Sequence, residues 1–147
     1  MDSESKSAGN VLAAIAESNA RFLEFANMLR SSHGVIKVAH DFECRRTTNY
    51  SEFGTGPRYL FDWYVDVELR NHVSVWWAMD VSWDEEYWII SSRVEMPGES
   101  RPKALNEIPD RHAGTINQFV SYLEAATSEL LDSADTVLAS VAEMSNS

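Results

Sequence analysis

The hydrophobic residues of this chain change their spacing twice, and this change limits the fold more than any other feature of the sequence. From residue 10 to residue 32 they recur every three or four positions, which predicts an amphipathic helix. From residue 36 to residue 96 they recur at every second position, which predicts strands, and the helical spacing returns between residues 116 and 144. The sequence therefore predicts an α+β fold of the order α-ββββ-α.

The first helix is expected to begin at Asn10 as its N-cap and to end near Ser32, because Gly34 suits the left-handed position after a helix. Residues 1–9 are rich in serine and charge and are interpreted as a disordered tail. Residues 10–144 are expected to form a single domain, with residues 145–147 as a frayed C-terminus. The expected buried stripe of the helix is Leu12, Ile15, Asn19, Phe22, Ala26 and Leu29.

Four strands are expected, over residues 36–44, 59–69, 73–83 and 88–96. A three-residue turn at residues 70–72 would place Leu69 opposite Val73, with Asn71 suited to a left-handed conformation. A turn with Glu85 and Glu86 at its tip would place Trp83 opposite Trp88. These lengths predict a four-stranded antiparallel meander with one packed and one wet face. The place of the first strand stays open, because a long polar connection, residues 46–57, follows it.

Residues 97–114 are expected to cross the domain without regular structure, and Thr115 and Gln118 form the pattern of a helix capping box. Both helices are expected to pack on the same face of the sheet. The apolar stripe of the second helix continues to Met144, and nine stripe positions leave more apolar surface than one sheet needs. We therefore expect a homodimer through the C-terminal helix, with Asn19 as a candidate register-setting residue.

The composition excludes several classes of function. A formal net charge of −11 opposes binding to nucleic acid or to an anionic membrane surface, so neither is expected as a partner. No apolar run reaches the length of a membrane span, and the polar start does not resemble a secretory signal. One cysteine rules out an intramolecular disulfide, and a reducing, cytoplasmic setting is expected. Nucleotide-binding, nucleophile-elbow and metalloprotease motifs are missing, so no cofactor or metal is predicted.

The wet face of the predicted sheet carries the candidate binding residues. The expected register sets Asp62 opposite Asp80, and Trp76 between Asp66 and Glu95. Facing carboxylates destabilise a sheet unless water, a cation or a basic partner compensates, and exposed aromatic rings beside them suit a protein surface. A metal site or an acid–base pair is a further reading. The candidate residues are Asp62, Tyr64, Asp66, His72, Trp76, Asp80, Tyr87 and Arg93.

Two further features have both a structural and a functional interpretation. His40 and Cys44 are expected on the packed face as buried residues, about 13 Å apart along one strand, which is too far for a catalytic dyad. The second helix has carboxylates where its dipole favours positive charge, and these are either solvated or a second partner surface. That candidate surface comprises Glu124, Glu129, Asp132 and Asp135.

These features favour a small, non-enzymatic, acidic module that covers a basic partner protein, as immunity proteins, antitoxins and secretion chaperones do. An alternative is an enzyme or small-ligand binder in which residues 46–57 and 97–114 close the sheet face into a pocket. A third hypothesis is a self-associating structural protein, whose dimer should dissociate when Val137 and Val141 are replaced by Asp.

Overall fold

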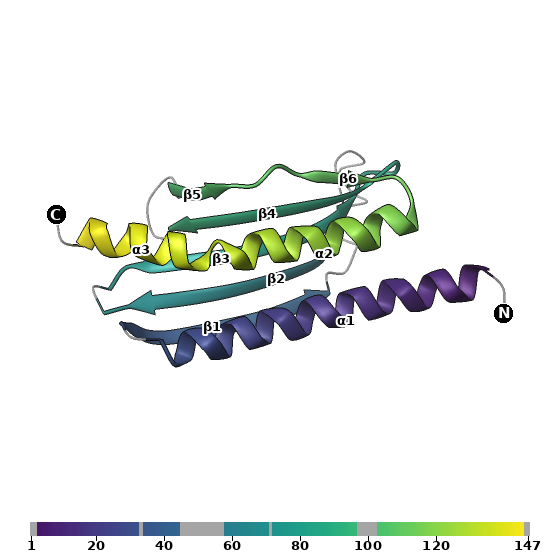
Figure 1. The fold of residues 1–147 in the computed structure, drawn as a ribbon. Helices are drawn as coiled ribbons and strands as arrows, with labels where there is room; N and C mark the ends of the chain where they lie inside the picture. The colour runs from purple at the N-terminus through teal and green to yellow at the C-terminus, as the bar shows by residue number, and fades with distance from the viewer. Residues whose placement is uncertain (1–2, 33, 45–57, 71, 97–102, 146–147) are drawn as a thin grey trace.

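One antiparallel sheet carries all the helices on the same face, as the computed structural model shows (Figure 1). The structure describes residues 3–32, 34–44, 58–70, 72–96 and 103–145. The sheet follows the order β1-β2-β3-β4-β5, and β6 also pairs with β4. The α+β class and its helix-strands-helix order are therefore confirmed. The elements are α1 (Ser3–Arg30), β1 (Val35–Cys44), β2 (Arg58–Leu69), β3 (Ser74–Trp83), β4 (Trp88–Met96), β5 (Lys103–Glu107), β6 (Arg111–Ala113), α2 (Ile116–Asp132) and α3 (Ala134–Ser145).

The sheet is larger than predicted, because the segment expected to be irregular adds strands to it. β5 and β6 both pair antiparallel with β4, so the sheet extends beyond the four-stranded meander. Prolines in this segment suggested irregular structure, but none of them lies in β5 or β6, and Pro109 stands between the two strands. Residues 97–102 of the same segment lie outside the described residues.

The predicted turns and the register of β2, β3 and β4 are confirmed. The backbone N–H of Leu69 donates to the carbonyl of Val73 at 2.9 Å, and Trp83 lies opposite Trp88. The left-handed residue observed in the first turn is His72, with φ 65°. Asn71, which was expected in that conformation, lies outside the described residues.

Helix α1 begins earlier than predicted and buries only part of the predicted stripe, namely Phe22, Ala26 and Leu29. It starts at Ser3, so the N-cap expected at Asn10 is wrong. Leu12 is 68% exposed and Asn19 is exposed, whereas Ser18 is buried. Two aromatic rings of the helix reach the sheet. Phe22 stacks on Trp63 and Phe25 meets Trp77 edge-on, with ring centroids 6.1 Å and 5.3 Å apart.

β1 forms an edge of the sheet beside β2, which corrects the expected burial of its residues. His40 and Cys44 lie opposite Val65 and Phe61, on the packed side as predicted, yet both are exposed at this edge of the sheet. The Nδ1 atom of His40 lies 3.1 Å from the guanidinium of Arg30. A bulge between Val35 and Lys37 leaves Ile36 54% exposed.

The C-terminal helical segment packs back on the sheet beside α1. Thr115 accepts a hydrogen bond from the backbone N–H of Gln118 at 3.1 Å, and the Gln118 amide accepts one from Gly114 at 2.9 Å. The predicted capping residues are therefore correct, although the segment divides at Ser133 into α2 and α3.

Val137 and Val141 are 3% and 0% exposed within a single chain. The surplus apolar surface inferred for the C-terminal helix is therefore not available at these positions. The predicted homodimer through this helix loses that argument and stays a prediction.

Candidate functional site

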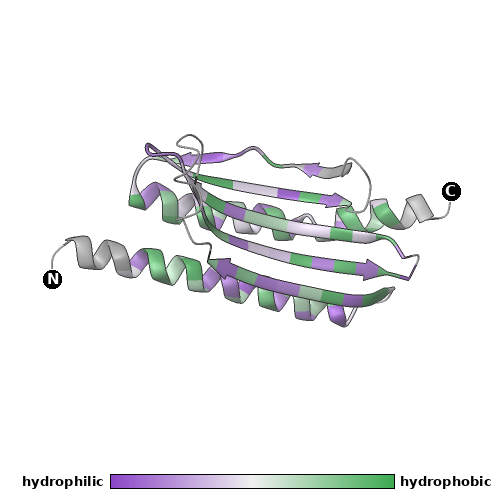
Figure 2. Ribbon diagram, turned by 180° about the vertical axis from the view of Figure 1, so that it is seen from behind, coloured by the Kyte–Doolittle hydropathy of each residue, from purple (hydrophilic) through white to green (hydrophobic). Residues whose placement is uncertain are grey.

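The face of the sheet opposite the helices is open (Figure 2), and no helix among the described residues covers it. Strand pairing sets its side chains in rows across β1 to β4. The central row runs Asp41, Tyr64, Ala78 and Arg93. On one side of it lie Ala39, Asp66, Trp76 and Glu95, and on the other lie Glu43, Asp62, Asp80 and Ser91. The predicted pairs Asp62–Asp80 and Asp66–Trp76 are therefore confirmed.

This face contains a hollow of about 630 Å³, which we call the sheet hollow. Its position follows from Ala78, which has the smallest side chain among its lining residues and stands between Tyr64 and Arg93 across the strands and between Trp76 and Asp80 along β3. The larger neighbours rise around this short side chain. The side chains of the outer face that line the hollow are Glu43, Tyr59, Asp62, Tyr64, Asp66, Trp76, Ala78, Asp80 and Arg93.

The electrostatics of the sheet hollow are dominated by carboxylates. The pKa of Tyr64 is raised, first by burial and then by the negative charges of Asp41, Glu43, Asp66 and Asp62. Each of these charges opposes the formation of a phenolate. The raised pKa of Tyr64 therefore indicates a negative potential over the β1–β2 side of the hollow.

Asp66 lies half-buried in this negative region, and burial raises its pKa. Glu68 raises the pKa further, whereas a hydrogen bond from the Trp76 side chain and the positive charge of Lys37 lower it. The indole N–H of Trp76 is a donor only, so it supports the ionised form of Asp66. A carboxylate that has lost part of its hydration in this way gains from an added cation.

Arg93 is the one basic side chain among the described residues that line the hollow. Its guanidinium lies 3.3 Å from a carboxylate oxygen of Glu95 and 3.6 Å from one of Asp80. The side chain of Arg93 is 54% exposed, so water screens both ion pairs. The β3–β4 side of the hollow is therefore partly neutralised by a residue of its own lining, whereas the positive charge that acts on Asp66 on the β1–β2 side comes from Lys37, outside the lining.

Six of the eight residues predicted for this face line the sheet hollow together, and two do not. His72 is exposed at the turn between β2 and β3, where its ring contacts Glu68 at 3.4 Å. Tyr87 lies at the turn before β4, and its ring meets that of His112 edge-on at 6.1 Å. Both residues belong to turns at the ends of the strands, and neither lines the hollow.

Sequence reasoning missed Tyr59 and Glu43 as lining residues. A bulge between Tyr59 and Phe61 reverses the side to which Tyr59 points, and it lies opposite Ser82 on the outer face. No sequence signal marks that bulge. The alternation along the first strand did predict that Glu43 lies on the polar face of that strand. Only the pairing of β1 with β2, however, brings Glu43 beside Asp62.

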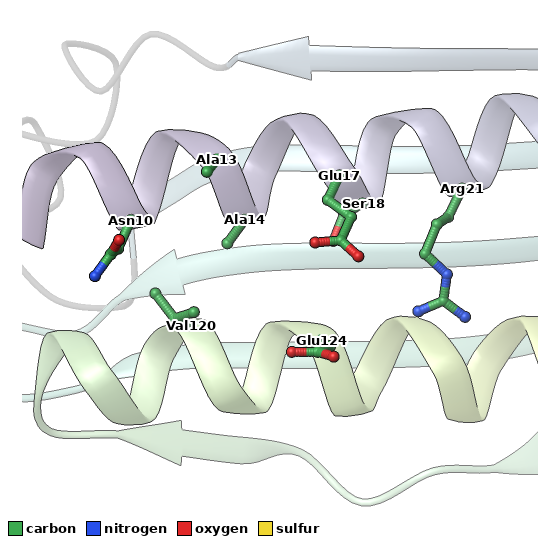
Figure 3. A pocket seen from close by; sticks show the side chains of 8 residues that line it. All are labelled: Asn10, Ala13, Ala14, Glu17, Ser18, Arg21, Val120 and Glu124. Atoms are coloured by element: carbon green, nitrogen blue, oxygen red, sulfur yellow. The ribbon is translucent and has the colours of Figure 1, made fainter.

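The second predicted surface does not form a single patch. Glu129 holds Arg111 of β6 at 2.8 Å, whereas Glu124 lines a smaller groove of about 210 Å³ between α1 and α2. In that groove Glu17 and Arg21 extend from α1 toward α2, and Val120 extends toward α1 (Figure 3). Asp132 and Asp135 are exposed near the junction of α2 and α3.

Potential metal ligands do not cluster among the described residues. None of their His, Cys, Asp and Glu side chains form a group of three or more that could hold a metal ion. The three described histidines, His40, His72 and His112, do not line the sheet hollow. Two segments, residues 46–57 and 97–114, were expected to close a pocket. The first lies outside the described part of the chain, and the second is described only from residue 103, where it forms β5 and β6. No described helix is long and apolar enough to cross a membrane.

Comparison of the chain with protein-family models, with curated proteins and with solved structures found no match. The function is therefore argued from the geometry of the sheet hollow.

Proposed function

We propose that this chain is a non-enzymatic binding module that holds a basic segment of a partner protein on the open face of its sheet. The observation that carries the proposal is the sheet hollow, in which four carboxylates and three aromatic rings surround Ala78. The partner would be covered in the manner of an immunity protein, an antitoxin or a secretion chaperone. The reducing, cytoplasmic setting expected from the single cysteine belongs to the same proposal.

Charge complementarity supports a basic partner. The whole chain has a net charge of −11, so its field attracts positively charged proteins over a long range at low salt. The sheet hollow concentrates this field around Tyr64, which is flanked by Asp62 and Asp66 along β2 and whose pKa is also raised by Glu43. A Lys or Arg side chain that enters would relieve the repulsion among these carboxylates.

The aromatic rings supply the second component of recognition. Tyr59, Tyr64 and Trp76 are between 36% and 38% exposed, so each ring keeps surface that a partner can cover. Aromatic faces attract ammonium and guanidinium groups, and tyrosine and tryptophan contribute much of the energy at protein interfaces. The same hollow therefore combines apolar area for the stem of a long side chain with carboxylates for its charged end.

The sheet hollow supports a binding role better than an enzymatic one. Its described lining contains no histidine, cysteine or serine to act as nucleophile or imidazole base. Its open form also suits a protein segment, whereas small-molecule sites enclose most of their ligand. Enclosure of the sheet face by residues 46–57 and 97–114 is the condition under which the small-ligand alternative would gain support.

Affinity capture from the native host at low and high salt tests the proposal, with variants that separate shape from charge. Wild type should retain a basic protein at low salt and release it at high salt. Ala78→Leu fills the hollow without changing the charge and should abolish retention. Replacing both Asp62 and Asp66 by Asn should also abolish retention, because it removes two charges from the hollow.

A matched control separates the hollow from the general acidity of the chain. Replacing Asp132 and Asp135 by Asn removes the same charge from the helical side and should leave retention nearly unchanged. Circular dichroism of every variant confirms that the fold is kept. The proposal is wrong if wild type retains no basic protein, or if Ala78→Leu retains it as well as wild type does.

A further inference from the structure

The two sides of the sheet hollow differ in how their charges are balanced. On the β3–β4 side, the guanidinium of Arg93 lies between Asp80 and Glu95, at 3.6 Å and 3.3 Å. On the β1–β2 side, Glu43 and Asp66 line the hollow together with Tyr64. None of the described lining side chains on that side is basic, and Lys37, whose positive charge lowers the pKa of Asp66, lies outside the lining. A positive group from outside therefore meets repulsion from Arg93 on one side and attraction on the other.

The aromatic groups also favour the β1–β2 side. Tyr64 stands between Asp41 and Ala78 in the central row, and Trp76 stands directly opposite Asp66. The Trp76 indole donates its hydrogen bond to Asp66, which ties this ring to the carboxylate it faces. A cation beside Asp66 would lie against the exposed surface of Tyr64 and Trp76, where ring and charge act in the same direction.

We propose that Arg93 is a built-in cation that directs the partner's basic side chain to the β1–β2 side of the hollow, between Asp66, Tyr64 and Trp76. Arg93 is thus a specificity-determining residue: it neutralises Asp80 and Glu95, so that a partner finds one cation subsite rather than two. This inference rests on the proposed function, which supplies the basic partner. It also assigns opposite effects to the loss of Arg93 and the loss of Asp66.

Isothermal titration of a blocked hexa-arginine peptide at low ionic strength tests this assignment in the full chain. Arg93→Gln should tighten binding about two- to fivefold, because it removes a repelling charge and exposes Asp80 and Glu95. Asp66→Asn should weaken binding about tenfold, since a charge-assisted hydrogen bond is lost. A blocked hexa-glutamate peptide provides the probe of opposite charge and should not bind.

Each variant has a control with the same change of net charge. Arg70→Gln changes an exposed arginine at the turn after β2, and Asp132→Asn changes an exposed carboxylate on α2. Arg93→Gln must tighten peptide binding more than Arg70→Gln does. Asp66→Asn must weaken it more than Asp132→Asn does. If Arg93→Gln matches its control or weakens binding, the role of Arg93 is overturned while the binding face survives. If wild type does not bind hexa-arginine, the proposed function itself fails.

Discussion

A buried pair of hydroxyl groups fixes α1 against α2, and its removal gives a prediction that can be worked from the geometry. The side-chain oxygens of Ser18 and Thr127 lie 3.0 Å apart, and the two residues are 3% and 0% exposed. Thr127 donates to the carbonyl of Leu123 at 2.8 Å. Because a hydroxyl has one proton, Ser18 must be the donor in the pair.

This assignment makes the two single replacements unequal. Thr127→Val removes the acceptor and leaves the Ser18 hydroxyl buried without its partner, which should cost about 1–3 kcal/mol of unfolding free energy. Ser18→Ala removes only a donor and leaves Thr127 bonded to Leu123, so its cost should be about 0.5–1.5 kcal/mol. The double variant leaves no hydroxyl behind and should be more stable than Thr127→Val alone.

Urea unfolding of the four proteins measures these values, with an unchanged slope as the sign that two-state unfolding is kept. The coupling energy between the two positions should be about 1–2 kcal/mol. If the two single costs simply add, within about 0.5 kcal/mol, the hydroxyl pair does not join the helices and the reasoning is refuted.

Three further predictions concern single positions. Because burial raises the pKa of Asp66 above 3.8, ionisation of this group costs stability as pH rises through the folded pKa. Asp66→Asn should therefore raise the urea midpoint at pH 7 and leave it unchanged at pH 3, and a lower midpoint at pH 7 would contradict this. The pKa shift of Asp84 has the opposite sign, since hydrogen bonds from two backbone N–H groups of its own turn lower its pKa. Asp84→Ala should lower the thermal midpoint at neutral pH, and the difference in midpoint from wild type should vanish as pH falls through the folded pKa of Asp84. Val141→Asp should unfold the chain, at a cost of about 3 kcal/mol or more, because that side chain is fully buried. If light scattering instead shows a dimeric wild type and a monomeric variant, and circular dichroism shows that the variant is folded, Val141 belongs to a dimer interface.

Much of the candidate site could be predicted because it depends on short-range geometry. The alternation along residues 59–96 sets which side chains share a face, and the two short turns set which of them lie opposite one another. Asp62, Asp66, Trp76, Asp80 and Arg93 were located by this reasoning. His72 and Tyr87 do not line the hollow, because both belong to the turns at the ends of the strands.

The sequence by itself determined the α+β class, the register from β2 to β4 and the start of α2 at Thr115, since each depends on residues close together in the chain. Only the tertiary structure decided the position of β1, which exposes His40 and Cys44 and adds Glu43 to the hollow. It also decided which rings of the sheet Phe22 and Phe25 of α1 contact, because Trp63 and Trp77 are distant from them in sequence. Bulges and strand order depend on the packing of the whole sheet, so short-range patterns in the sequence do not predict them.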